Sequence, residues 1–264
     1  MEDCDLLYEA AQMGAEIALS YFAKNIKTWT KAGNSPVSEA DLAVDSALKA
    51  FLLNARPEYG WISEESADAR DQSAFSRFFV LDPIDGTRGF LSKSKIWCIS
   101  LAIIEEGRPI ASVLYCPLKE ELYKAIKGKG AYLNGKLLSP HFKKPQSKVH
   151  ELMLSVPLKL QEAIDFTDYK DFKLLWHAKI PSLAYCFALA VKGEVDIIIT
   201  RRGCYDWDIA AVDLILEELG QFIIDNNGNK VRYGVNDYRH AHLFLYPKDC
   251  KKLIETLQTY LQTA

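Results

Sequence analysis

The sequence predicts an α+β fold, in which helices and sheets occupy separate blocks of the chain. Apolar residues recur at helical spacing near both ends, whereas the middle alternates short β-rich runs with turns. The chain has 264 residues, of which 49% are apolar and 25% charged, as in an ordinary globular protein with a large core. A Rossmann-type alternation of single strands and helices does not fit this pattern.

Two helices are expected at the N-terminal end. Residues 3–24 place their apolar side chains on one helix face. A second helix begins at Ser38 and stops before Pro57, because proline cannot continue it. Asp41 follows Ser38 by three residues, which is the spacing of a capping box.

The middle of the chain predicts a mainly antiparallel meander. Turn sequences such as "EEGRP", "KGKG" and "LNGK" separate its short β-rich runs. The expected strands are 78–81, 97–104, 110–115, 121–125 and 131–133, with a further short apolar strand just before Glu64.

The second half mixes strands and helices. A soft boundary at 139–148 precedes it, within what we expect to be one domain over residues 1–264. The expected elements are strands at 152–156, 196–200 and 222–224, helices at 182–191 and 208–219, and a last helix after Pro247.

Composition excludes several classes of protein. Basic and acidic residues number 32 and 35, and the formal charge of −3 argues against a dedicated nucleic-acid binder. The sequence shows no signal peptide and no apolar run of membrane-spanning length. Six dispersed cysteines form no C-x-x-C pair, and Cys98, Cys116 and Cys186 sit in apolar runs, which predicts buried thiols and a cytoplasmic setting.

The stretch "FFVLDPIDGTRGF" carries the strongest chemical signal. Asp82 lies at or just past the end of an apolar strand, and Asp85-Gly86 then turns the chain. Carboxylates three residues apart across such a turn can converge, and Gly86 lets backbone amides approach an anion. Hard cations such as Mg²⁺ take oxygen ligands of this kind together with substrate phosphate.

Three further acidic segments could join this site. They are "WISEESA" with Glu64 and Glu65, "KAGNSPVSEAD" with Asp41, and "CYDWDIAA" with Asp206 and Asp208. Taken singly, each has a structural explanation: a solvated loop, a capping box, or a carboxylate favoured by the helix dipole.

Taken together, "SPVSEAD", "SEES", "LDPIDGTRGF" and "DWDIAA" resemble the motifs of the inositol monophosphatase family of Mg²⁺-dependent, lithium-sensitive phosphatases. The family-like stretches "ELYKAIKGKGAYLNGK" and "AVKGEVD" lie between them, and the resemblance spans about residues 31–225. It implies the layered α-β-α-β-α sandwich of the sugar phosphatases, with the site where two halves meet.

The resemblance also implies roles for individual residues. Two or three Mg²⁺ ions would be held by Glu64, Asp82, Asp85, Asp208 and the main-chain carbonyl of Ile84. Thr87 and Asp41, with Glu64, would orient and deprotonate the water that attacks phosphorus in line, without a covalent intermediate. The predicted phosphate- and substrate-binding residues are Asp85, Gly86, Thr87, Ser182, Thr200, Asp206 and Asp208.

The substrate stays open between several branches of the family. Inositol-specific members carry a glutamate where Thr200 stands here, whereas acid-Trp-Asp, present as Asp206-Trp207-Asp208, is typical of the 3'(2'),5'-bisphosphate nucleotidases. "GTRGF" matches the usual form of neither branch, and GTR occurs in histidinol-phosphatase-like members. Arg88, Arg201 or Arg202 could pair with a second phosphate, although solvated surface is the default for each.

An enzyme is favoured over a binding module, because clustered like charges cost stability unless a metal neutralises them. The leading expectation is hydrolysis of an inositol phosphate or similar small phosphorylated metabolite, with Li⁺ as an inhibitor. The alternatives are a bisphosphate nucleotidase, a histidinol-phosphatase, a fructose-1,6-bisphosphatase and a non-catalytic partner of transcription or ribosome maturation. Relatives are often homodimers, but no residue pattern here determines the oligomeric state.

Overall fold

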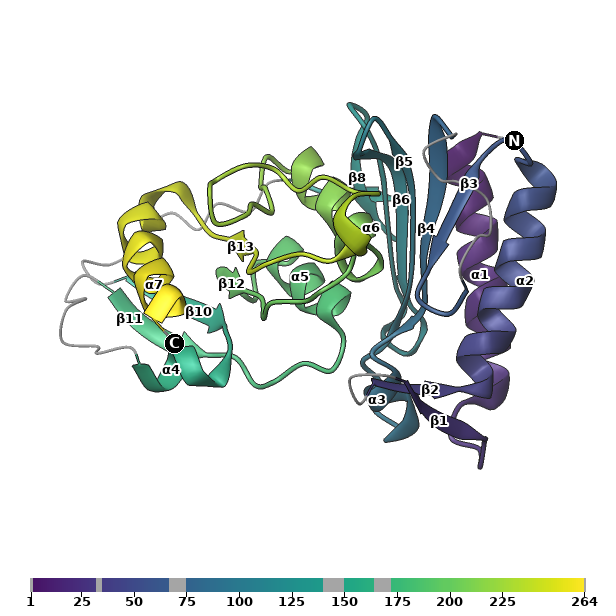
Figure 1. The fold of residues 1–264 in the computed structure, drawn as a ribbon, viewed down its shortest axis with the longest axis horizontal. Helices are drawn as coiled ribbons and strands as arrows, with labels where there is room; N and C mark the ends of the chain where they lie inside the picture. The colour runs from purple at the N-terminus through teal and green to yellow at the C-terminus, as the bar shows by residue number, and fades with distance from the viewer. Residues whose placement is uncertain (1, 32–34, 67–74, 140–149, 164–171, 264) are drawn as a thin grey trace.

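The computed structural model describes residues 2–31, 35–66, 75–139, 150–163 and 172–263. Five layers follow one another across the molecule (Figure 1): a helix pair, a large sheet, a second helix pair, a small sheet and a last pair of helices. This is the predicted α-β-α-β-α arrangement, and the fold class is confirmed.

The first layer contains α1 (Asp3–Tyr21) and α2 (Glu39–Ala55), close to the expected bounds. Ser38 caps α2, and its backbone N–H donates to the Asp41 carboxylate at 2.8 Å, which confirms the capping box. A separate antiparallel pair, β1 (Thr28–Lys31) and β2 (Ser35–Ser38), precedes α2 and was not expected.

The large sheet has the strand order β3-β4-β5-β6-β7-β8-β9, and all its neighbours are antiparallel except β3 and β4. The predicted meander is therefore correct from β4 onward. Its strands are β3 (Gly60–Ser63), β4 (Arg77–Asp85), β5 (Cys98–Glu105), β6 (Arg108–Cys116), β7 (Glu121–Ile126), β8 (Gly130–Leu133) and β9 (Lys136–Leu137).

Both faces of this sheet are covered, which explains why its strands are apolar on both sides. Along β4, Phe79 and Leu81 join the core formed with α1 and α2. Val80, between them, belongs instead to the core formed with α5 (Leu183–Val191) and α6 (Asp206–Glu218). Successive side chains of β4 thus point to opposite faces of the sheet and contribute to both cores.

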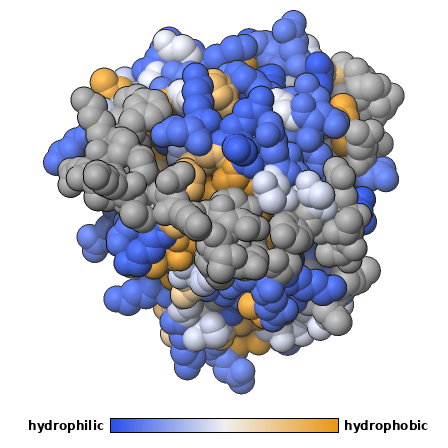
Figure 2. Space-filling view, turned by 90° about the vertical axis from the view of Figure 1, so that its left-hand side faces the viewer, coloured by the Kyte–Doolittle hydropathy of each residue, from blue (hydrophilic) through white to orange (hydrophobic). Residues whose placement is uncertain are grey.

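The small sheet has the order β11-β10-β12-β13, with β10 parallel to both of its neighbours. Its strands are β10 (His150–Ser155), β11 (Phe172–Trp176), β12 (Ile197–Ile199) and β13 (Phe244–Leu245). Helices α4 (Leu158–Ala163) and α7 (Lys251–Thr263) complete the outer layer, and side chains of both pack on this sheet. The end of the molecule with this layer shows mostly hydrophilic residues among its coloured atoms (Figure 2).

Two expectations from the sequence concern the strand at 222–224 and the boundary at 139–148. The strand expected at 222–224 does not form, and Ile224 makes only isolated bridges to Lys230 and Phe244. The reason is the turn that follows at once, where the Asp225 carboxylate accepts from the backbone of Asn227 and Asn229. The boundary expected at 139–148 lies almost wholly outside the described residues.

The cysteines behave as predicted: all six are free and buried, including Cys98, Cys116 and Cys186. A search of the described residues found no helix that combines the length and the apolarity needed to cross a bilayer.

Gly89, in α3 (Thr87–Leu91), lies very close to the backbone of a neighbouring segment. A Cβ there would lie 2.7 Å from the Ile96 carbonyl oxygen and 2.9 Å from Pro181 Cγ. We expect Gly89→Ala to lower the free energy of unfolding by about 1–3 kcal/mol, because backbone cannot move aside easily. Urea denaturation measures this change. Gly14→Ala is the control: the nearest atom to its Cβ would be Leu48 Cδ1 at 3.1 Å, a side-chain atom at a longer distance, so this change should cost less.

Candidate active site

The end of β4 positions the central carboxylates. β4 extends through Asp85, and its pairing with β5 shifts register between Asp82 and Asp85. Asp82 therefore lies inside the strand, opposite Ser100, rather than at its end as the sequence suggested. Gly86 then adopts φ 95°, a left-handed conformation that favours glycine, and Thr87 begins α3.

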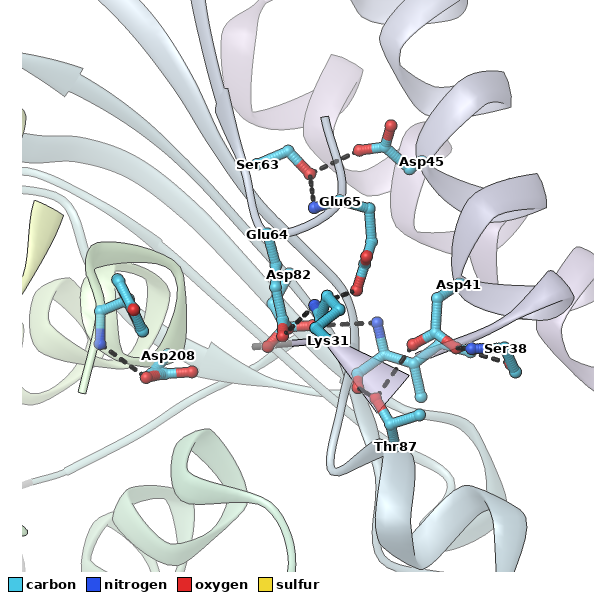
Figure 3. A network of polar contacts seen from close by, with 12 residues as sticks. Lys31, Ser38, Asp41, Asp45, Ser63, Glu64, Glu65, Asp82, Thr87 and Asp208 are labelled. Carbon is cyan, nitrogen blue, oxygen red and sulfur yellow. Dashed lines mark hydrogen bonds and ion pairs between the residues drawn. The ribbon is translucent and has the colours of Figure 1, made fainter. Parts of the chain in front are cut away.

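Asp82, Asp85 and Asp208 come together although they lie on two separate elements of the fold. Each offers a carboxylate oxygen, and these oxygens lie within 4.8 Å of one another. Asp82 and Asp85 come from β4, whereas Asp208 comes from the first turn of α6, on the other side of the site (Figure 3). The structure thus brings together three of the four predicted metal-ligating side chains.

Asp85 is held by the start of α5. Its carboxylate accepts from Ser182 Oγ at 2.5 Å, Ala184 N at 2.7 Å and Leu183 N at 3.2 Å. Burial raises the pKa of Asp85 to about 6; the three hydrogen bonds lower it, and the charge of Glu64 raises it further.

Asp208 is held by its own helix. α6 begins at Asp206, two residues earlier than the sequence suggested, so Asp206 and Asp208 both fall in its first turn. The Asp208 carboxylate accepts from the backbone N–H of Tyr205, the residue before the helix, at 2.7 Å. Burial, with the charge of Asp85, still raises the pKa of Asp208 well above its usual range.

Glu64 and Glu65 follow β3 and meet a lysine that the sequence analysis did not assign. Lys31 Nζ lies 2.6 Å from Glu64 Oε1 and 2.8 Å from Glu65 Oε1 (Figure 3). Burial raises the pKa of Glu65 to about 7, with Lys31 opposing and Glu64 adding to the rise. Lys31 begins the stretch "KAGNSPVSEAD", and no spacing rule marks it as a partner of residues 33 and 34 positions away.

Thr87 and Asp41 meet as the resemblance implied. Thr87 Oγ1 lies 3.0 Å from Asp41 Oδ1 and 3.1 Å from the Ile84 carbonyl oxygen. The other Asp41 oxygen accepts from Ser38 Oγ at 2.6 Å, so the capping box also orients this carboxylate. Burial raises the pKa of Asp41, although the hydrogen bonds from Ser38 and Thr87 oppose it.

The three remaining predicted substrate residues are buried and already have partners. Ser182 donates to Asp85 and caps α5 through Tyr185 N. Thr200 Oγ1 accepts from Leu243 N at 3.0 Å. Asp206 is fully buried, and its carboxylate lies 2.7 Å from both His240 Nε2 and Gly234 N. Both of its oxygens therefore hydrogen-bond within the protein.

The electrostatics of the cluster favour a cation. Burial raises the pKa of Asp82 well above its usual range, and the charges of Glu64, Asp85 and Asp208 raise it further. The donors are all oxygens, which suit a hard divalent ion bound about 2.1 Å from each. A spacing below 4.8 Å is near the span of such a coordination shell. The residues present therefore fit a Mg²⁺ site.

One known protein family matches almost the whole chain. The model of the "Inositol monophosphatase family" matches residues 2–262. The chain belongs to this family. Its members include proteins of several named functions, so membership by itself leaves the substrate undetermined.

Three curated relatives illustrate this range. Inositol monophosphatase 3 of Solanum lycopersicum is 28% identical, over 86% of this chain and 87% of that protein. Nus factor SuhB of Pasteurella multocida is 29% identical, over 96% and 94%. The 3'(2'),5'-bisphosphate nucleotidase CysQ of Aggregatibacter actinomycetemcomitans is 26% identical, over 85% of each. Among solved structures, the Thermotoga maritima IMPase is 21% identical with a TM-score of 0.81 over 100% of this chain and 99% of its own, a likeness of fold.

The raised carboxylate pKa values predict how the metal-free protein responds to pH. Folding raises the pKa of Asp85, so the protonated carboxyl contributes to the free energy of unfolding. That contribution is present at pH 4 and is lost as pH rises through about 6. We expect the metal-free protein to lose roughly 2 kcal/mol between pH 5 and 8, or about 4–8 °C in Tm. Thermal unfolding in a chelator measures this loss, and Mg²⁺ at pH 8 should reverse it.

Asp82→Asn provides the control for this prediction. Removing one of the converging charges should raise the metal-free Tm at pH 8 and weaken both the pH dependence and the shift on adding Mg²⁺. A metal-free Tm that rises steadily from pH 5 to 8 in the unsubstituted protein would contradict the assignment of these carboxylates.

Proposed function

We propose that this protein is a Mg²⁺-dependent phosphomonoesterase that acts on an inositol phosphate or a similar small phosphorylated metabolite. The observation that carries the proposal is the convergence of two buried carboxylates, Asp82 and Asp85, with the partly buried Asp208. The charges of Glu64, Asp85 and Asp208 all raise the pKa of Asp82, so this arrangement is costly to fold unless the site serves a cation.

The residues that would hold Mg²⁺ are Asp82, Asp85 and Asp208, with Glu64 and the Ile84 carbonyl beside them. Bound there, two or three ions would offset the charge of a phosphate monoester and acidify the attacking water. For Glu64 to take part, its carboxylate would exchange the Lys31 ammonium, 2.6 Å away, for the ion.

Thr87 and Asp41 would prepare the attacking water. Thr87 has one hydroxyl proton and two acceptors, Asp41 Oδ1 and the Ile84 carbonyl. When Thr87 donates to Asp41 rather than to Ile84, its oxygen can accept a hydrogen bond from the attacking water, and the Ile84 carbonyl would be available to hold a metal. The buried Asp41 carboxylate then acts as the final proton acceptor of the pair.

The turn after β4 would bind a phosphate oxygen through the backbone N–H groups of Gly86 and Thr87. Glycine is required there for two reasons. The φ of 95° strains any other residue, and a Cβ would come within 3.0 Å of Ser182 Cβ, at the group that holds Asp85.

A second candidate is a 3'(2'),5'-bisphosphate nucleotidase. The acid-Trp-Asp sequence at 206–208 and the similarity to the CysQ nucleotidase favour it. Asp206 would influence substrate specificity by holding the segments of His240 and Gly234, which hydrogen-bond to its oxygens, and not by contacting the substrate.

Phosphate release by the purified protein tests the proposal. The substrates are inositol 1-phosphate, 3'-phosphoadenosine 5'-phosphate, fructose 1,6-bisphosphate and histidinol phosphate, each with Mg²⁺, with chelator, and with added Li⁺. We expect release that requires Mg²⁺ and is inhibited by Li⁺, greatest for inositol phosphate. Preference for the adenosine bisphosphate would establish the second candidate instead, and no release from any substrate would overturn the proposal.

Thr87 offers the sharpest test of the proposed proton transfer. We expect Thr87→Ala to lower kcat by roughly 10²–10³-fold, because the group that accepts the water proton is lost. Thr87→Ser keeps the hydroxyl and should stay close to the unsubstituted rate. Equal loss in both variants would mean that the methyl group's packing, rather than the hydroxyl, matters.

A further inference from the structure

Helix α2 carries a second buried carboxylate one turn after Asp41. Asp45 follows by four residues, so the two side chains project from the same face of the helix. Asp41 is 1% exposed and Asp45 is 5% exposed, which is rare for aspartate without a committed partner. Asp41 faces Thr87, whereas Asp45 faces the end of β3 (Figure 3).

The partner of Asp45 is Ser63, the last residue of β3. Ser63 Oγ donates to Asp45 Oδ1 at 2.5 Å, and both groups are buried. The same Ser63 oxygen accepts from Glu65 N at 3.4 Å, a longer contact. A chain of two hydrogen bonds thus runs from α2 through Ser63 to the turn that bears Glu64 and Glu65.

We propose that Asp45 is a positioning residue, which through Ser63 holds the Glu64–Glu65 turn in place for binding the divalent cation. The inference rests on the proposed function, because it concerns the same metal site. Asp45 acts through Ser63 rather than as a ligand. Helix α2 then has two roles: Asp41 orients the Thr87 hydroxyl, and Asp45 positions the Glu64–Glu65 turn.

The electrostatics explain why such an anchor is needed. Glu64 faces Asp82, whose pKa its charge raises, so repulsion pushes the turn away from the cluster when no cation is present. Glu64 is otherwise held by its backbone N–H, which donates to the Leu81 carbonyl at 3.2 Å, and by Lys31. Lys31 must release Glu64 when a cation binds, whereas the Asp45–Ser63 bond can persist throughout.

Four variants test this arrangement: Asp45→Ala, Asp45→Asn, Ser63→Ala and the Asp45→Ala/Ser63→Ala double variant. Mg²⁺ affinity is measured by calorimetry, and hydrogen exchange of residues 61–66 is measured in the metal-free protein. We expect Asp45→Ala and Ser63→Ala each to weaken Mg²⁺ binding by about 10–100-fold and to speed exchange at 64–66. The amide side chain introduced by Asp45→Asn keeps an acceptor oxygen for Ser63, so this variant should retain most of the affinity.

The double variant distinguishes the mechanism from general destabilisation. If both residues act through one bond, the double variant binds Mg²⁺ about as weakly as either single variant. Val44→Ala is the matched control: Val44 is fully buried beside Asp45, so its truncation should lower Tm while leaving Mg²⁺ affinity and exchange at 64–66 unchanged. Ser63→Ala keeps the test available should Asp45→Ala fail to fold.

The outcomes separate this inference from the proposed function. Unchanged Mg²⁺ affinity and exchange in Asp45→Ala and Ser63→Ala would overturn the positioning role, even if the protein hydrolyses phosphate esters. Additive losses in the double variant would also overturn it. Weakened binding and faster exchange would support it even if the unsubstituted protein released phosphate from no substrate, an outcome that would count only against the proposed function.

Discussion

The mutual repulsion of the clustered carboxylates is the constraint on which the rest of this structure depends. Asp82, Asp85 and Asp208 are brought within 4.8 Å of one another, and their environment raises the pKa of each. Without a cation, this arrangement would relax by protonation or by separation of the segments that carry it. The protein therefore has to hold each segment by hydrogen bonds to groups outside the cluster.

Each carboxylate-bearing segment has such an anchor. Ser182 and the first amides of α5 hold Asp85, and the backbone N–H of Tyr205 holds Asp208. Thr87 is tied to Asp41, and the Glu64–Glu65 turn is tied to Asp45 through Ser63. These anchors belong to different layers, so the metal site depends on the packing of both helix pairs against the large sheet.

Much of the fold and of the metal site could be predicted from the sequence. Helical periodicity located α1 and α2 to within a few residues, and alternation with turn signals located β4 to β8. The elements that were missed are short or depend on distant partners, such as β1, β2 and β13, whose pairing no local pattern encodes. Asp82 and Asp85 were found because they share one short motif after an apolar strand, whereas Glu64 and Asp208 were assigned through the resemblance to the family.

The sequence by itself determined which residue types could bind a divalent cation and which helices and strands would carry them, because both follow from side-chain chemistry and local periodicity. Only the tertiary structure decided which polar groups face the site. Ser182, Thr200 and Asp206 are buried with partners of their own, whereas Lys31 pairs with two glutamates that lie 33 and 34 positions away in the sequence. The physical reason is that hydrogen-bond partners are chosen by packing between layers, and the spacing of residues along the chain does not encode that packing.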